Sequence, residues 1–296
     1  MKKFAYSAIA TSLLLVASLN GAHAAEGGGT VLALGAENYG AGMVPPPGTY
    51  WLTYATHYEA NRVNNATGHD VGGDGFHVTA DVIAPRFIWV MPYKLLGGDP
   101  LVHVIAPLVS LDVKAGGASQ RASGLGDITV GSEIAFHDGN FHSVAGVDVY
   151  LPTGKYDKND LANIGHNHTA VDVVYAASYA TDKLALDIKS GYLFNQKNDD
   201  TAYTSGQLFH FDYSAGLRVA PGWTAGIGGY YLLQTTSDKS QGTTLDDSKA
   251  RSLSIGPSVR YDGGQGWLVT LKYEKEVMAR NRTQGNALWL KAVLPF

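Results

Sequence analysis

The chain has 296 residues and contains 36 glycines, 17 tyrosines and no cysteine. Because cysteine is absent, neither a disulfide framework nor a thiolate metal site is possible. Charged residues make up 16% of the chain and hydrophobic residues 45%, whereas a soluble domain usually carries about 25% charge. The formal net charge of −4 argues against a nucleic-acid partner. The sequence shows no nucleotide-binding motif, so we expect no cofactor.

Residues 1–24 have the organisation of a cleaved signal peptide. Two lysines precede a short apolar run centred on residues 13–16, and Ala22-His23-Ala24 supplies a small-residue cleavage site. We therefore expect Sec-type export with cleavage near Ala24, which would leave a net charge of −6. An uncleaved anchor is the alternative, but the apolar run is shorter than the roughly 18 residues that a membrane helix needs.

Residues 25–48 are rich in glycine and proline, which predicts an irregular segment. This segment has one apolar patch, which contains Val31, Leu32 and Leu34.

From residue 49 to residue 296 the hydrophobic period changes to two, which is the period of a β-strand with one apolar face. In residues 183–194, for example, Leu186 and Ile188 alternate with Asp187 and Lys189. Each such segment is close to the ten or so residues that a tilted membrane strand requires. We predict twelve strands, at residues 49–60, 75–90, 101–113, 125–137, 140–151, 169–180, 183–194, 206–219, 223–235, 250–262, 266–277 and 285–296.

The predicted connections alternate in length. Long polar loops follow the first, third, fifth, seventh, ninth and eleventh strands, and tight turns such as Asp138-Gly139 and Ala220-Pro221-Gly222 separate them. Bacterial outer-membrane barrels have short periplasmic turns and longer extracellular loops. We therefore predict an all-β, up-and-down antiparallel transmembrane barrel with both termini in the periplasm, embedded in outer-membrane lipid. A soluble β-sandwich or lipocalin-like fold is the alternative, and it would require the apolar faces to form a dry core.

Several short motifs of this chain resemble those of a known family, and they contain Gly124, Gly126, Asp127, Pro152, Thr153, Gly154 and Tyr156. The chain is similar to outer-membrane proteins of the MetA-pathway phenol-degradation family, and the resemblance extends over essentially the whole chain after residue 25. The resemblance implies an outer-membrane barrel that acts as a channel or transporter for aromatic or other hydrophobic compounds. The final Phe296 resembles the C-terminal signal by which the barrel assembly machinery recognises its substrates.

The polar strand faces carry charges of both signs. One interpretation is a charged constriction that selects a permeant, and the other is a set of ion pairs that hold a filled lumen together. Residues 25–48 could enter the lumen as a plug through Val31, Leu32 and Leu34, or could form a flexible periplasmic tail. The candidates for the lumen are Asp127, Glu133, Asp148, Asp172, Asp187, Lys189, Asp212, Arg218, Arg260, Lys272 and Glu274.

Metal binding and catalysis receive little support from the sequence. His166 and His168, with Asp157, Asp160 and His69, have metal-ligand chemistry, but isolated loop histidines are far more common than metal sites, so we predict no metal. Catalysis by Ser143 with His142 is disfavoured because neighbouring strand residues face opposite ways. No nucleophile motif is present, so we predict that the protein is not an enzyme.

These observations predict a passive outer-membrane channel for a small hydrophobic or aromatic permeant. A general hydrophilic pore is the first alternative, and an open polar lumen would favour it. A structural barrel whose loops bind a partner is the second, and a sealed lumen with large apolar loop patches would favour that reading.

Overall fold

The computed structural model describes residues 26–264 and 266–295. The signal peptide at residues 1–24, its cleavage site near Ala24 and the C-terminal Phe296 lie outside the described residues. After the short 3-10 turn η1 (Glu26–Gly28), the structure consists of strands. Their bounds are β1 (Gly48–Asn64), β2 (His77–Val90), β3 (Asp99–Ile105), β4 (Leu108–Ala115), β5 (Ala118–Leu125), β6 (Ile128–Asp138), β7 (Phe141–Leu151), β8 (Ala170–Ala180), β9 (Leu184–Asn195), β10 (Lys197–Asn198), β11 (Tyr203–Thr204), β12 (Leu208–Ala220), β13 (Trp223–Gln234), β14 (Lys239–Ser240), β15 (Thr243–Thr244), β16 (Arg251–Asp262), β17 (Leu268–Arg280) and β18 (Arg282–Pro295).

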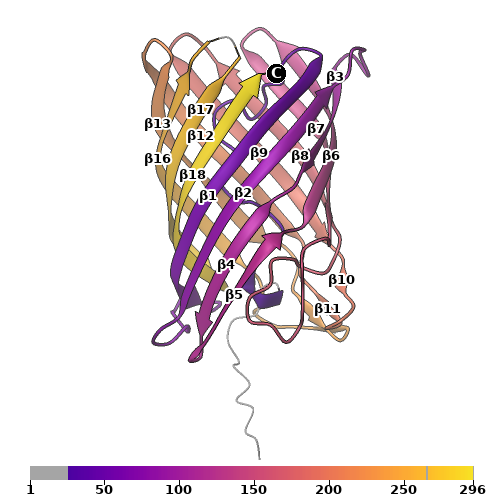
Figure 1. The fold of residues 1–296 in the computed structure, drawn as a ribbon, viewed down its shortest axis with the longest axis vertical. Helices are drawn as coiled ribbons and strands as arrows, with labels where there is room; N and C mark the ends of the chain where they lie inside the picture. The colour runs from indigo at the N-terminus through magenta and orange to yellow at the C-terminus, as the bar shows by residue number, and fades with distance from the viewer. Residues whose placement is uncertain (1–25, 265, 296) are drawn as a thin grey trace, which may run out of the picture.

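The long strands form a closed antiparallel barrel (Figure 1). Each long strand pairs with its sequence neighbours, and β1 closes the wall by pairing with both β2 and β18. Because β3 with β4 and β5 with β6 each make one broken strand, the fourteen strands of the sheet form a twelve-stranded wall over the described residues. The predicted fold class and strand number are therefore confirmed.

Two breaks in the wall were not predicted. β3 stops before Ala106-Pro107, where proline lacks the N–H that would continue the ladder. Opposite it, β5 and β6 are separated by Gly126 and Asp127, and the strand gains one residue there, as at a β-bulge.

The prediction of a long loop after the third strand is wrong, because β4 and β5 form a hairpin there. Its two-residue turn, Gly116-Gly117, has φ values of +57° and +80°, which suit glycine in a hairpin turn.

The outer face of the barrel is apolar. Exposed side chains around the wall include Phe87, Val130, Ile188 and Leu271, and they alternate with buried polar residues on the same strands. Such an outward apolar band is what a barrel in lipid requires, since every backbone group of the closed wall is already paired.

No helix among residues 26–264 and 266–295 is long and apolar enough to cross a membrane.

The long connections lie together at one end of the barrel, and the C-terminal end of β18 lies at the other (Figure 1). Two of the long connections carry a small sheet in the order β10-β11-β14-β15 that the sequence did not indicate, because two-residue strands show no periodicity. We refer to the two ends as the loop end and the turn end.

Residues 26–47 run through the barrel from the loop end to the turn end. Glu26 bonds to Tyr156 and Asn198 of the long connections, and Gly48 begins β1 at the turn end opposite Val90. The wall itself begins and ends at the turn end, where Tyr50 of β1 pairs with Pro295 of β18, and that both termini lie in the periplasm stays a prediction. The course of residues 26–47, which places Glu26 at the loop end, was not predicted. The reason is that an irregular segment has no strand pattern from which its course can be derived.

We predict that a charge on the outer face has a cost that depends on its depth. Ile188 lies near the middle of β9, 38% exposed, and Leu217 lies close to the turn end of β12, 58% exposed. Ile188→Arg should lower the free energy of unfolding in vesicles by about 2–4 kcal/mol and Leu217→Arg by at most about 1 kcal/mol. Urea titration of both variants measures the difference, and equal costs would contradict the assignment of this face to lipid.

Candidate functional site

The N-terminal segment, residues 26–47, is held to the inner wall through its own backbone. The N–H groups of Gly35 and Glu37 both donate to the carboxylate of Asp212, each over 2.9 Å. The N–H of Gly40 donates to Asp187 over 2.8 Å. Hydrogen bonds to a charged acceptor are among the stronger ones in proteins, so the buried wall carboxylates fix the course of a segment that has no sheet partner.

Glu37 is the centre of the contacts inside the barrel. Its carboxylate accepts hydrogen bonds from Lys291 Nζ at 2.8 Å and from Tyr54 Oη at 2.8 Å, and Arg86 lies 3.4 Å away. Its backbone carbonyl accepts a hydrogen bond from Lys272 Nζ at 2.9 Å. All five residues are buried. The Glu37 carboxylate therefore contacts cations of both β2 and β18, the two strands that flank β1.

Further charges continue from Glu37 along the wall. Arg86 lies 3.6 Å from Glu133, whose carboxylate is 3.5 Å from His103 Nε2. His103 in turn is 3.0 Å from Asp148, and Lys189 is 3.5 Å from the other oxygen of that carboxylate. The trio of His103, Glu133 and Asp148 has the spacing of a metal site, but Arg86 and Lys189 already balance its two carboxylates. Buried charges are stable only when they are paired in this way.

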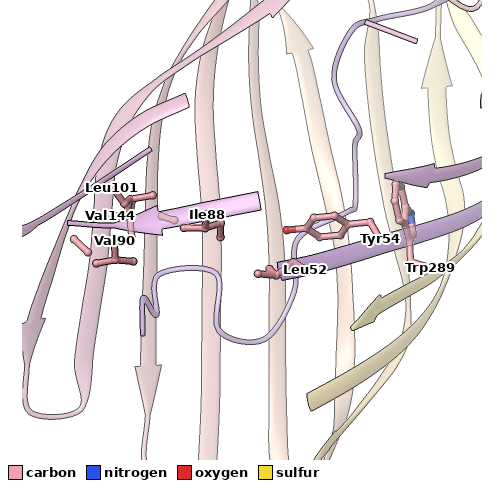
Figure 2. Packing of buried hydrophobic residues seen from close by; sticks show 9 residues of the cluster. Leu52, Tyr54, Ile88, Val90, Leu101, Val144 and Trp289 are labelled. Atoms are coloured by element: carbon pink, nitrogen blue, oxygen red, sulfur yellow. The ribbon is translucent and has the colours of Figure 1, made fainter. Parts of the chain in front are cut away.

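Apolar contacts hold the segment on both sides of these charges. Val31, Leu32 and Leu34 pack against Leu193, Leu208, Tyr230 and Leu232 of the inner wall. Closer to the turn end, Ala36, Ala41 and Val44 pack against a second cluster that includes Leu52, Ile88 and Trp289. Figure 2 shows side chains of that cluster pointing from the strands into the barrel, beside the coil of the segment.

Little space is left beside Glu37. A cavity of about 20 Å³ lies between Glu37, Ala41, Arg86, Glu133 and Lys189, which is room for one or two water molecules. In this conformation the segment and the paired charges therefore fill the lumen at this level.

Most of the predicted lumen residues face the interior. Asp172 pairs with His210 at 2.9 Å, Lys272 with Glu274 at 2.7 Å, and Arg260 lies over the ring of Tyr39. Arg218 is on the inward face of β12 but is exposed at the turn end, away from the cluster.

Glu37, Arg86, His103 and His210 were missed by the sequence reasoning. Alternation could have indicated the last three, which share faces with residues that it assigned to the lumen.

Asp127 does not join the cluster but fastens the loop of residues 152–168. Its carboxylate accepts hydrogen bonds from the N–H of Gly154 at 3.0 Å and from the N–H and ring of His166 at 2.8 and 3.0 Å. Thr153 Oγ1 donates to the carbonyl of Gly126 at 2.9 Å. Gly154 packs so closely on Gly165 that a Cβ on either would lie within 3 Å of the other's backbone. The family-motif residues thus tie this loop to the break between β5 and β6.

The Asp127 carboxyl stays ionised in this contact, because its pKa is lowered. Burial alone would raise the pKa of the Asp127 carboxyl, but hydrogen bonding and charge from His166, with the backbone N–H of Gly154, outweigh burial and lower it. A lowered pKa contributes stability above the ordinary carboxyl pKa and loses it as the pH falls through the lowered value. The contacts of Asp127 therefore stabilise the loop at neutral pH, and this contribution is lost in acid.

At the loop end, one part of the wall has its faces reversed. Residues 77–83 of β2 with β4 and β5 form what we call the projecting sheet. Beyond an outward apolar row of Ile83, Leu108 and Leu125, its outward side chains are polar, among them Asp81, Asp112 and Arg121. Apart from Gln120 and Gly124 of β5, the inward positions are apolar and half-buried. They are Val78, Ala80, Val82, Val109, Leu111, Val113 and Ala122. Elsewhere the inner wall combines the two apolar clusters with many buried polar and charged residues.

The residues considered for metal binding or catalysis do not come together. His166 bonds to Asp127, and His168 bonds to the carbonyl of His166 and to Asn195. Asp157 and Asp160 bond within or beside their loop, and His69 bonds to Thr67. Ser143 and His142 lie on opposite faces of β7, and His142 contacts His137.

Comparison with known families gives a match over residues 60–292, to the family described as "Putative MetA-pathway of phenol degradation". The chain belongs to this family. A comparison with curated protein sequences gives no match. Family membership agrees with the resemblance carried by the motif residues.

A solved structure shares this fold, and others are more distantly similar. The COG4313 outer membrane channel from Pseudomonas putida F1 is similar with a TM-score of 0.77 and 21% identity, covering 86% of this chain and 98% of that one. The β-domain of the Bordetella autotransporter BrkA has a TM-score of 0.48 and 11% identity, covering 85% and 100%. The NanC porin has a TM-score of 0.44 and 10% identity, covering 83% and 100%.

We predict that Glu37→Gln loosens the N-terminal segment. Removing one partner from a buried ion pair costs about 3–5 kcal/mol, and here Lys291 and Arg86 both lose a carboxylate. Backbone amides of residues 31–44 should exchange with deuterium at least a hundredfold faster. The control Glu59→Gln changes the same charge on an exposed residue of β1. Exchange as slow as in that control would show that Glu37 does not hold the segment.

Proposed function

We propose that the protein is a passive outer-membrane channel for small hydrophobic compounds, with aromatic molecules as the favoured class. The apolar inner face of the projecting sheet carries this proposal. A water-filled pore presents polar side chains inward, whereas here the inner face of the wall at the loop end includes Val82, Leu111 and their apolar neighbours. Such a lining favours molecules that gain from leaving water.

The filled lumen supports the same proposal against a general hydrophilic pore. Sugars and ions need a continuous polar path, and the space beside Glu37 holds only one or two waters. Passage therefore requires the N-terminal segment to shift, with the charged residues around Glu37 forming the constriction. The fold shared with the Pseudomonas putida channel and the family membership agree with this role.

Uptake by cells tests the proposal. Leu111 and Ser110 are neighbours on β4 that face inward and outward, respectively, so Leu111→Asn and Ser110→Asn form a matched pair. Loss of about 1 kcal/mol of apolar contact should slow entry of a labelled neutral monoaromatic about fivefold in Leu111→Asn cells. Ser110→Asn cells should match the wild type, and entry of a small labelled sugar should not depend on the protein.

Two outcomes would contradict the proposal. Faster entry of both sugar and aromatic in cells that contain the wild-type protein would indicate a general pore. Unchanged entry of both would remove the transport role and favour a structural or surface-interaction barrel.

A further inference from the structure

A basic pocket lies at the rim of the barrel at the loop end. It encloses about 410 Å³ and is lined by residues of β13, β16 and β17 and of the connections that follow β1 and β13. Three of its lining side chains are cations, Lys249, Arg251 and Arg280, and one is an acid, Asp247. This local excess of positive charge contrasts with the net charge of −4 of the whole chain.

Strand register places these cations outside the barrel. Leu233, Arg251 and Arg280 are direct neighbours across β13, β16 and β17, and each terminates its strand or is next to the terminus. The adjacent residues Leu232 and Ser252 are fully buried and face inward. Because successive residues of a strand point to opposite sides, the guanidinium groups belong to the outer face.

The pocket borders the apolar band of the outer face on its loop-end side. One step toward the turn end, the outward row consists of Tyr231, Leu253 and Met278, which are also paired in register. Cations at the rim and apolar side chains below match the order of a lipid, whose charged headgroup lies above its acyl chains. Residues of the connections, among them Ser237 and Ala66, close the pocket on the loop side.

The cations are free to bind an anion. Within the described part of the chain, no ion pair includes Lys249, Arg251 or Arg280, although Asp247 lines the same pocket. Guanidinium groups match phosphate oxygens with paired N–H donors. A pocket of this size suits a small polar headgroup.

We propose that this pocket binds the phosphorylated glucosamine headgroup of the glycolipid in the outer leaflet. The phosphate contacts Arg251 and Arg280, with Lys249 beside it, and the acyl chains lie along Tyr231, Leu253 and Met278. This site is separate from the lumen and does not depend on the transport role.

Binding of bis-phosphorylated lipid A to the full-length protein in detergent, followed by native mass spectrometry, tests the proposal. Arg251→Gln/Arg280→Gln should weaken binding at least tenfold, and Arg280→Gln alone should weaken it less. The control Lys114→Gln/Arg121→Gln removes two exposed charges from β4 and β5 at the same end and should bind like the wild type. Lipid A without phosphate should bind the wild type as weakly as bis-phosphorylated lipid A binds the double variant.

Three results would overturn the proposal. In the first, the double variant binds lipid A as tightly as the wild type does. In the second, the control variant loses as much affinity as the double variant. In the third, an equimolar amount of inorganic phosphate displaces lipid A. The last result would identify a site for a soluble anion. Far-ultraviolet circular dichroism of each variant confirms that its barrel is folded before binding is compared.

Discussion

The carboxylate of Glu37 is the contact on which the interior of this barrel depends. It lies in the lumen on a segment without regular structure, and it satisfies Lys291, Tyr54 and Arg86 on the three adjacent strands β18, β1 and β2. A buried cation without a partner is costly, so the wall and the segment stabilise each other. The segment provides the charge that the wall cations need, and Asp212 and Asp187 provide the acceptors that its backbone needs.

The barrel is thereby divided along its length. Around Glu37 the interior is charged, paired and nearly full, whereas toward the loop end the inner face of the projecting sheet is mainly apolar and half-buried. The loop of residues 152–168 is tied by Asp127 to the break beside that sheet. Because the break also inserts one residue into the fourth strand, the same feature lets β4 and β5 project and anchors the loop beside them.

Much of the wall could be predicted from the sequence, because a period of two in hydrophobicity directly reports a strand with two different faces. The twelve segments and the inward direction of Asp148, Asp187 and Lys272 follow from this pattern. The breaks at Pro107 and Gly126 could not be placed, because apolar residues continue the alternation on both sides of them. Their effect on pairing depends on which strands meet, and that is a tertiary property.

The contacts inside the lumen could be predicted less well from the sequence. The apolar patch at Val31, Leu32 and Leu34 suggested contact with the wall, but Glu37 lies among glycines where no face can be assigned. Its importance arises from Lys291 and Arg86, which are 254 and 49 residues away in the chain. Likewise, His103 and His210 gain their roles only through carboxylates on other strands.

Single-channel conductance of the full-length protein in planar bilayers is the most direct test that the segment around Glu37 closes the lumen. The structure predicts that the wild-type protein conducts potassium chloride only in rare, brief openings, because steady flow of ions needs a continuous water-filled path. A steady, large conductance in the wild-type protein would contradict this account and would mean that the lumen is open in the membrane.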